Sequence, residues 1–249
     1  MINKLFLFAL TILMLLFPAC GPSDENLNSE NLRELILQAL NRDEEANVKL
    51  KGLIDEELIS RIDFNSIRID SGYVNKKYYY SVLLEYSDPL LNRFAIYDDQ
   101  FGLYLIDKSL NGNLSAEWAE KENRLFVFLQ ERFLTKDVLD IDRLSIYEIY
   151  DTTAALIYRS ISRFTKEKNT STQTIENISS DFIATKISVN VHSTIINQTD
   201  TFYFNSVSRK YLSSINLFDD FVKQEINDFR WVIIKPQIPS IDLKNSPLP

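Results

Sequence analysis

The spacing of apolar side chains changes between residues 62 and 66 of the chain. From residue 31 to 42 apolar positions follow a helical period, which predicts an amphipathic helix with Asn31 as N-cap and Glu34 as its N3 partner. Residues 43–62 continue this pattern, although Gly52 interrupts it. We expect a helical hairpin that covers one face of a sheet. An amphipathic helix on a membrane or partner is the alternative, but the polar face is acidic where membrane-surface helices are basic.

From residue 66 onward, runs of β-branched and aromatic residues indicate strands. The predicted strands are residues 66–70, 77–86, 93–97, 103–107, 124–130, 143–150, 154–160, 182–192, 201–208 and 230–234. In the strand 182–192 the odd-numbered residues are expected to face the core, while Lys186, Ser188 and Asn190 face outward. The polar stretch 165–180 predicts a long hairpin loop.

These elements predict a mainly β (α+β) fold. A helix over residues 216–229, with Asn216 and Asp219 as cap residues, follows the strands. We expect one globular domain over residues 31–235, with helical residues 31–62 packed on an antiparallel meander sheet or sandwich formed by the β-rich residues 66–235. The proline-rich tail 236–249 is expected to be extended.

The first residues of the chain have the pattern of a targeting segment. Lys4 is the only charge before an apolar core that runs from residue 5 to 17. A membrane-spanning helix needs about 20 apolar residues, whereas a signal-peptide core needs about 7 to 15. The pattern predicts a signal peptide over residues 1–19 that ends before Cys20, the only cysteine. The alternative is a free thiol in an uncleaved anchor or in an ordinary signal peptide cut nearby.

The sequence Phe17-Pro18-Ala19-Cys20 resembles the lipobox of bacterial lipoproteins, where a small residue precedes the cysteine that receives lipid. The resemblance implies lipid attachment to Cys20 and a polar tether over residues 20–30. Gly21, rather than aspartate, follows the cysteine. The lipoprotein sorting rule then implies delivery to the outer membrane. Ser23-Asp24-Glu25 is similar to the acidic tags of surface lipoproteins, so both a periplasm-facing and a surface-facing anchor stay open.

A short pattern recurs within the β-rich part. Residues 93–97 (RFAIY) return as residues 143–147 (RLSIY), and serine-containing hairpin ends follow near residues 160 and 206. This order is similar to the blades of β-propellers, whose repeat is about 40 to 50 residues. A small propeller-like repeat is therefore an alternative to the meander. An antiparallel meander also repeats hairpins, and it requires no closure.

Composition and motifs narrow the classes of function. The chain has 27 basic and 35 acidic residues and a net charge of -8, so it lacks the basic surface that nucleic-acid binding needs. One Cys, one His and five Gly provide no zinc motif, disulfide framework or glycine-rich phosphate loop. A serine or cysteine triad would have to use His192, which ends a predicted strand where solvent or a polar partner is its ordinary environment. No catalytic residue, metal or cofactor is predicted.

The densest acidic positions are Asp98-Asp99, Asp140 with Asp142, and Asp219-Asp220. Asp140 and Asp142 would point the same way on a strand and could chelate Ca²⁺, but no following Asp, Asn or Gly completes a calcium loop. We expect solvated turn acids at all three places. Glycoside hydrolysis needs only two carboxylates that the fold brings together. An anchored glycan hydrolase is therefore the alternative function.

Aromatic residues are the candidates for ligand contact. Trp118, Trp231 and the run Tyr78-Tyr79-Tyr80 could stack on sugars, although core packing is expected for both tryptophans. Tyr78 and Tyr80 share one face of a strand and Tyr79 takes the other, so at least one phenol should be exposed. The function expected from these observations is a membrane-anchored, non-catalytic binding, adhesion or scaffold module of the cell envelope. Its partner would be an envelope protein or a glycan.

Overall fold

The computed structural model describes residues 28–228, apart from residues 63, 111, 135–138, 168 and 192–193. Cys20, His192, Trp231, the predicted strand 230–234 and the tail 236–249 lie outside the described residues. The helices are α2 (Ser29–Leu40), α3 (Glu44–Lys49) and α4 (Leu217–Asp228), with 3₁₀ turns at Glu56–Arg61, Phe64–Ser66 and Pro89–Leu91. None of the helices in this part of the chain is long and apolar enough to cross a membrane.

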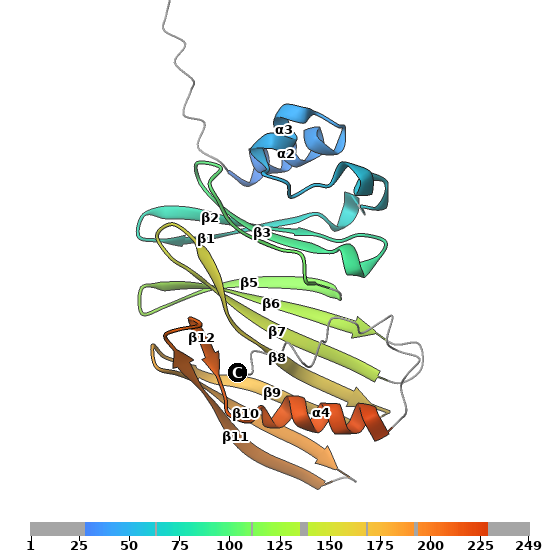
Figure 1. The fold of residues 1–249 in the computed structure, drawn as a ribbon, viewed down its shortest axis with the longest axis vertical. Helices are drawn as coiled ribbons and strands as arrows, with labels where there is room; N and C mark the ends of the chain where they lie inside the picture. Colours follow the sequence, from blue (N-terminus) through green and yellow to red (C-terminus); the bar gives the residue numbers. More distant parts are fainter. Residues whose placement is uncertain are drawn as a thin grey trace, which may run out of the picture.

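The described residues form two antiparallel sheets in which each strand pairs with its neighbours in sequence (Figure 1). The first sheet has the order β1 (Arg68–Val74), β2 (Lys77–Leu84), β3 (Arg93–Asp98) and β4 (Leu103–Asp107). The second runs from β12 back to β5: β5 (Asn113–Lys121), β6 (Arg124–Leu134), β7 (Leu139–Ile149), β8 (Ala154–Lys166), β9 (Asn169–Ile178), β10 (Phe182–Val191), β11 (Thr194–Asn205) and β12 (Lys210–Leu212). The mainly β meander is confirmed.

The propeller-like alternative is wrong. Propellers divide their strands into blades of about four around a channel, whereas eight consecutive strands continue a single sheet here. The repeated segments lie on β3 and β7, which are inner strands of different sheets. Their similarity reflects two similar strand environments.

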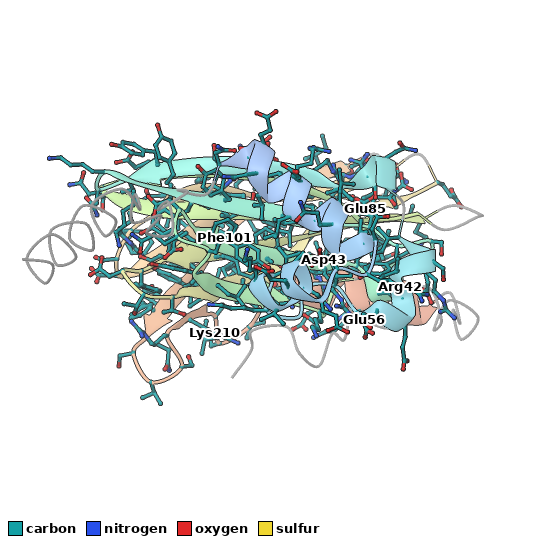
Figure 2. All side chains as sticks on the ribbon, turned by 90° about the horizontal axis from the view of Figure 1, so that it is seen from above. Arg42, Asp43, Glu56, Glu85, Phe101 and Lys210 are labelled. Carbon is teal, nitrogen blue, oxygen red and sulfur yellow. The ribbon has the colours of Figure 1, made fainter. Side chains whose placement is uncertain are left out.

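Helices α2 and α3 cover one face of the first sheet. Viewed from above, α2 and α3 lie over the strands, with Arg42 and Asp43 at the turn between the helices (Figure 2). Leu32, Ile36 and Leu50 are buried against inward residues of β2 and β3. The expected helical cover is therefore present, and its apolar face is the one that the sequence pattern indicates.

Two details of the helical part differ from expectation. The N-cap is Asn28, whose side chain accepts hydrogen bonds from the amides of Glu30 and Asn31 at 2.9 Å. Asn31 is the N3 partner, and its side chain accepts from the Asn28 amide at 2.6 Å. The second helix ends at Lys49, because Lys51 and then Gly52 adopt positive φ angles of 51° and 79° that a helix cannot continue.

A second core lies between the two sheets. Leu83, Phe94 and Ile96 of the first sheet pack against Val127 and Tyr147 of the second. Both faces of β2 and β3 are therefore buried, one under the helices and the other against β6 and β7. This explains why these strands read as almost continuous apolar runs.

The second sheet is strongly curved. This is seen from one hydrophobic cluster that contains residues of strands far apart in the strand order. Phe126 on β6 and Tyr158 on β8 share a core with Ile183, Phe202 and Tyr211 from β10, β11 and β12. α4 closes the concave side, where Phe218 and Val222 pack with residues of β6, β7, β8 and β10. In Figure 1 this C-terminal part forms the end of the molecule opposite α2 and α3.

The expected loop over residues 165–180 is wrong, because β8 reaches Lys166 and β9 occupies most of the rest. The stretch is polar, yet Ser171 and Gln173 are buried and hydrogen-bonded. Threonine and serine suit a strand whose inward side chains find polar partners. β5 and β12 were also not among the predicted strands.

The predicted alternation along β10 is confirmed over its first half. Ile183, Thr185 and Ile187 are buried and Lys186 is exposed. Toward the hairpin end the pattern weakens, since Ser188 and Val189 are both half-buried. Val189 still packs against the cluster around α4.

Candidate functional site

The acidic pairs expected in solvated turns have different structural roles. Asp98 matches the expectation of a turn acid: it accepts from the amides of Gln100 at 3.0 Å and Gly102 at 2.5 Å and so closes the β3–β4 turn. Asp142 contradicts it, because its side chain is only 1% exposed. Asp219 is also buried, while its neighbour Asp220 pairs with Lys223 at 3.1 Å.

Asp142 is the centre of an ion cluster on β6, β7 and β8. Its oxygens accept from Gln130 at 2.8 Å, from Arg132 at 3.2 Å and from Arg163 at 2.7 and 3.0 Å. Burial alone would raise the pKa of Asp142, but the two guanidinium groups outweigh this effect and lower the pKa. The carboxylate is thus a structural anion, and no group of three or more His, Cys, Asp or Glu in the described ranges could hold a metal ion.

A second buried network joins the two sheets and was not predicted from the sequence. Arg143 donates to both oxygens of Glu131, at 2.6 and 2.8 Å, and to the carbonyl of Ser109 at 3.0 Å. Next to it, Arg159 donates to Asp107 at 2.6 Å and to the Tyr147 hydroxyl at 3.0 Å. We call Asp107, Glu131, Arg143, Tyr147 and Arg159 the inter-sheet network. Its two acids and two guanidinium groups balance in charge.

The protonation states of the inter-sheet network suit a structural role. Burial would raise the pKa of Asp107, but the Arg159 guanidinium and hydrogen bonds from Ser109 and Tyr147 lower it. Burial raises the pKa of Tyr147 well above its ordinary value, and the Asp107 carboxylate adds to this effect. The network therefore pairs an ionised acid with a neutral phenol. Neither group has the proton affinity near neutral pH that general acid or base catalysis favours.

The third polar cluster fixes the start of α4 to the sheet. Asp219 accepts from the Ser160 hydroxyl at 2.8 Å and from the Ile161 amide at 2.9 Å. Asn216 accepts from the Asp219 amide at 3.1 Å, so it is the N-cap that the sequence predicted. Asp200 accepts from Ser213 at 3.0 Å and from the Leu217 amide at 3.2 Å. Ser160 is 2% exposed and lies in a polar anchor rather than in an open cleft.

The candidate aromatic residues divide between the core and the surface. Trp118 donates to Ser81 at 3.1 Å and packs over Gly72 between the sheets, as expected of a core residue. Tyr79 and Tyr80 are buried. Tyr78 is 50% exposed and packs against Tyr73, with ring centroids 4.6 Å apart. The expected exposed phenol is therefore Tyr78.

The largest concentration of exposed apolar side chains lies elsewhere, at the C-terminal end of the second sheet. Of eleven large apolar residues that are exposed in the described part, seven fall on β11 or in the following residues up to the start of α4. These seven, which we call the distal patch, are Ile195, Ile196, Tyr203, Phe204, Val207, Ile215 and Leu217. Figure 1 places these elements at the end of the molecule farthest from α2. Single exposed apolar residues are ordinary, but seven of these eleven gather on β11 and the segment that follows it. Adjacent residues of β11 face opposite sides of the sheet.

The sequence contained a signal for the distal patch, in the uncharged run from residue 194 to 199 and the two isoleucines within it. The strand predicted for this part of the chain begins at residue 201 and so does not include the run. Comparison with protein families, curated proteins and solved structures found no match. The functional argument therefore depends on this chain alone.

Proposed function

We propose that the protein is a lipid-anchored bacterial envelope protein that acts as a non-catalytic binding, adhesion or scaffold module. The distal patch is the observation that carries this proposal, because it exposes seven large apolar residues at one end of the fold. The anchor would be a lipid on Cys20, at the opposite end of the chain. A module held at its N-terminal end and apolar at its far end is arranged to meet a partner away from the membrane.

The alternative glycan hydrolase has less support. A two-carboxylate mechanism needs a general acid with a raised pKa and a second carboxylate about 5 to 9.5 Å away, both facing a substrate cleft. The buried acids of the ion clusters accept hydrogen bonds from arginines, and the pKa values of Asp107 and Asp142 are lowered. Buried Asp219 accepts from Ser160 and the Ile161 amide instead. No observation among the described residues favours hydrolysis over binding.

The proposal is tested by the size of the native complex. Wild-type chain released from its own membranes in mild detergent should run as a complex larger than one copy. Tyr203→Glu combined with Val207→Glu should reduce its size, because both side chains belong to the distal patch. Val48→Glu is the matched control, since Val48 is 76% exposed on α3 at the other end of the molecule. Equal complex sizes for the patch variant and the control would refute binding through this patch.

A further inference from the structure

The hairpin of β1 and β2 differs in charge from the rest of the chain. Residues 71–84, which include its turn and all of β2, contain no acidic residue, whereas the whole chain has 35 of them among 249 residues. Asn75 and Lys76 form the turn with positive φ angles of 50° and 65°, as the two-residue turns of hairpins require. Lys76 and Lys77 are both exposed. The tip of this hairpin is therefore a small basic site on an acidic protein.

Two tyrosines form an exposed aromatic pair beside these lysines. Tyr73 lies opposite Tyr78 in the strand register, and their ring centroids are 4.6 Å apart. Tyr73 is 49% exposed and Tyr78 is 50% exposed. Tyr78 lies two residues before Tyr80, which is buried in the core under α2 and α3. Because side chains alternate along a strand, the pair lies on the sheet face that the helices cover, at a part that they leave exposed.

The nearest acids in the register lie behind the tip. The pairing of β2 with β3 begins at Tyr79 and Asp98, so Lys77 and Tyr78 precede it. The Asp98 carboxylate accepts from the amide of Gly102 and so belongs to its own turn. On β1 the nearest acid is Asp70, four residues before the end of the strand. Residues 73–78, which we call the hairpin tip, thus combine two lysines with two phenols and contain no acid.

The hairpin tip lies at the end of the molecule that the proposed anchor would hold. Cys20 and Asn28 are separated by eight residues, which span at most about 29 Å when fully extended. Asn28 is the N-cap of α2. Figure 1 shows that α2 lies over the first sheet and begins on the side where β1 turns into β2. A lipid on Cys20 would therefore keep this side of the first sheet close to the membrane surface.

We propose that the hairpin tip contacts the anionic phospholipid headgroups of the membrane that holds the lipid anchor. Lys76 and Lys77 are attracted to a negatively charged bilayer surface. Tyrosine favours the headgroup level, because its ring is apolar and its hydroxyl is polar. The chain as a whole has a net charge of -8 and is repelled by such a surface. The contact at the tip therefore selects one orientation of the domain. This inference rests on the proposed function, because it needs the lipid on Cys20.

The test measures the reactivity of lysine amines in the full chain. The chain is purified from its membranes in detergent and added to preformed vesicles of phosphatidylcholine, with or without phosphatidylglycerol. A water-soluble acetylating reagent is then applied, and mass spectrometry gives the rate at each lysine. Lys76 and Lys77 should react at least fivefold more slowly on the anionic vesicles, and high salt should remove this protection by screening. Lys186, exposed on β10 of the second sheet, should react equally on both vesicles.

A pair of variants separates the aromatic contribution from the anchor. Tyr73→Ser combined with Tyr78→Ser should reduce the protection of Lys76 and Lys77 to less than twofold, because the rings no longer hold the tip among the headgroups. Both tyrosines are half exposed, so the fold should tolerate the change. Tyr203→Ser is the matched control, since Tyr203 is 65% exposed on β11 at the other end of the molecule. This control should keep the full protection.

Three outcomes would overturn the inference. These are equal rates for Lys76 and Lys77 on the two kinds of vesicle, protection that persists in high salt, and full protection in the double tyrosine variant. Failure of the anchor is distinguishable by flotation in a density gradient. A chain that does not float with vesicles refutes the anchor and this inference together. A chain that floats while its tip lysines react freely keeps the anchor and refutes only the contact at the tip.

Discussion

Arg143 and Glu131 face each other on adjacent strands, form two hydrogen bonds of 2.6 and 2.8 Å, and are both almost fully buried. Breaking such a pair leaves one charge buried without compensation, which costs about 3 to 5 kcal/mol. Glu131→Leu should therefore lower the free energy of unfolding by about this amount. The double variant Glu131→Leu with Arg143→Met should recover part of the loss, because neither charge of this pair is then left buried without its partner. Urea unfolding of the three proteins measures this, and a double variant less stable than Glu131→Leu would contradict the argument.

Stability should fall in acid because of Asp142 and Asp107. The pKa of each carboxyl is lower in the folded chain than in the unfolded chain. The stabilisation is therefore present above the unfolded pKa of about 4 and is lost as the pH falls through the folded values. Asp142→Asn should be less stable at pH 7 and should lose less stability than wild type between pH 5 and pH 3. Parallel acid dependence of the two proteins would show that Asp142 does not contribute.

Gly72→Ala should disturb Trp118, because a Cβ atom at residue 72 would overlap the indole ring. We expect a loss of stability and a shift in tryptophan emission. Gly52→Ala is the control: its Cβ atom would meet no neighbour, although its positive φ of 79° makes alanine strained there. This variant should lose about 1 kcal/mol and keep the emission unchanged. An unchanged spectrum for Gly72→Ala would place Trp118 elsewhere.

The alternation along β10 gives a comparison between neighbouring residues. Ile187 is 2% exposed and Lys186 is exposed. Ile187→Asp buries an unpaired charge and should cost several kcal/mol or prevent folding, whereas Lys186→Asp should change the free energy of unfolding by less than about 0.5 kcal/mol. Denaturant unfolding checks both. Equal effects would mean that β10 is not half-buried in the described register.

Lipid on Cys20 is expected from the lipobox-like sequence at residues 17–20. Metabolic labelling with a fatty acid should label the wild-type chain, and Cys20→Ser should carry no label. The unprocessed segment 1–19 should be absent from the labelled protein. Label of equal strength in both proteins would show that the lipid is attached at another residue or that the label is not covalent.

Sequence patterns predicted the elements whose apolar residues are periodic. α2 and β10 are examples, because burial on one face imposes a period that the sequence displays. β9 was missed because two of its three buried positions are Ser171 and Gln173, which find hydrogen-bond partners across the sheet. In the sequence, a polar residue that is buried in the core cannot be told from one in a loop unless its hydrogen-bond partner is known.

The burial of two acidic residues was likewise not predictable from the sequence pattern. Asp142 and Asp219 were expected in solvent, because a carboxylate is rarely buried without partners. Their partners are Arg132 and Arg163 in one case and Ser160 in the other, the last from a strand that precedes α4 by more than fifty residues. Arg132 and Arg163 lie directly opposite Asp142 on the neighbouring strands, so this pairing follows from the strand register. The pairing of Asp219 depends on where α4 packs on the second sheet, and nothing local in the sequence specifies that position.

The order of strands also bears on how the chain reaches its native state. Since both sheets pair only consecutive strands, every backbone ladder closes a short loop, and the loss of chain entropy for each pairing is small. Chains dominated by local contacts fold faster than those that must join distant segments. A polypeptide that emerges from a translocation pore with its N-terminus first could form these hairpins one after another, each on the edge left by the previous one. β11 would be the last long edge formed, and α4 would then close the concave side.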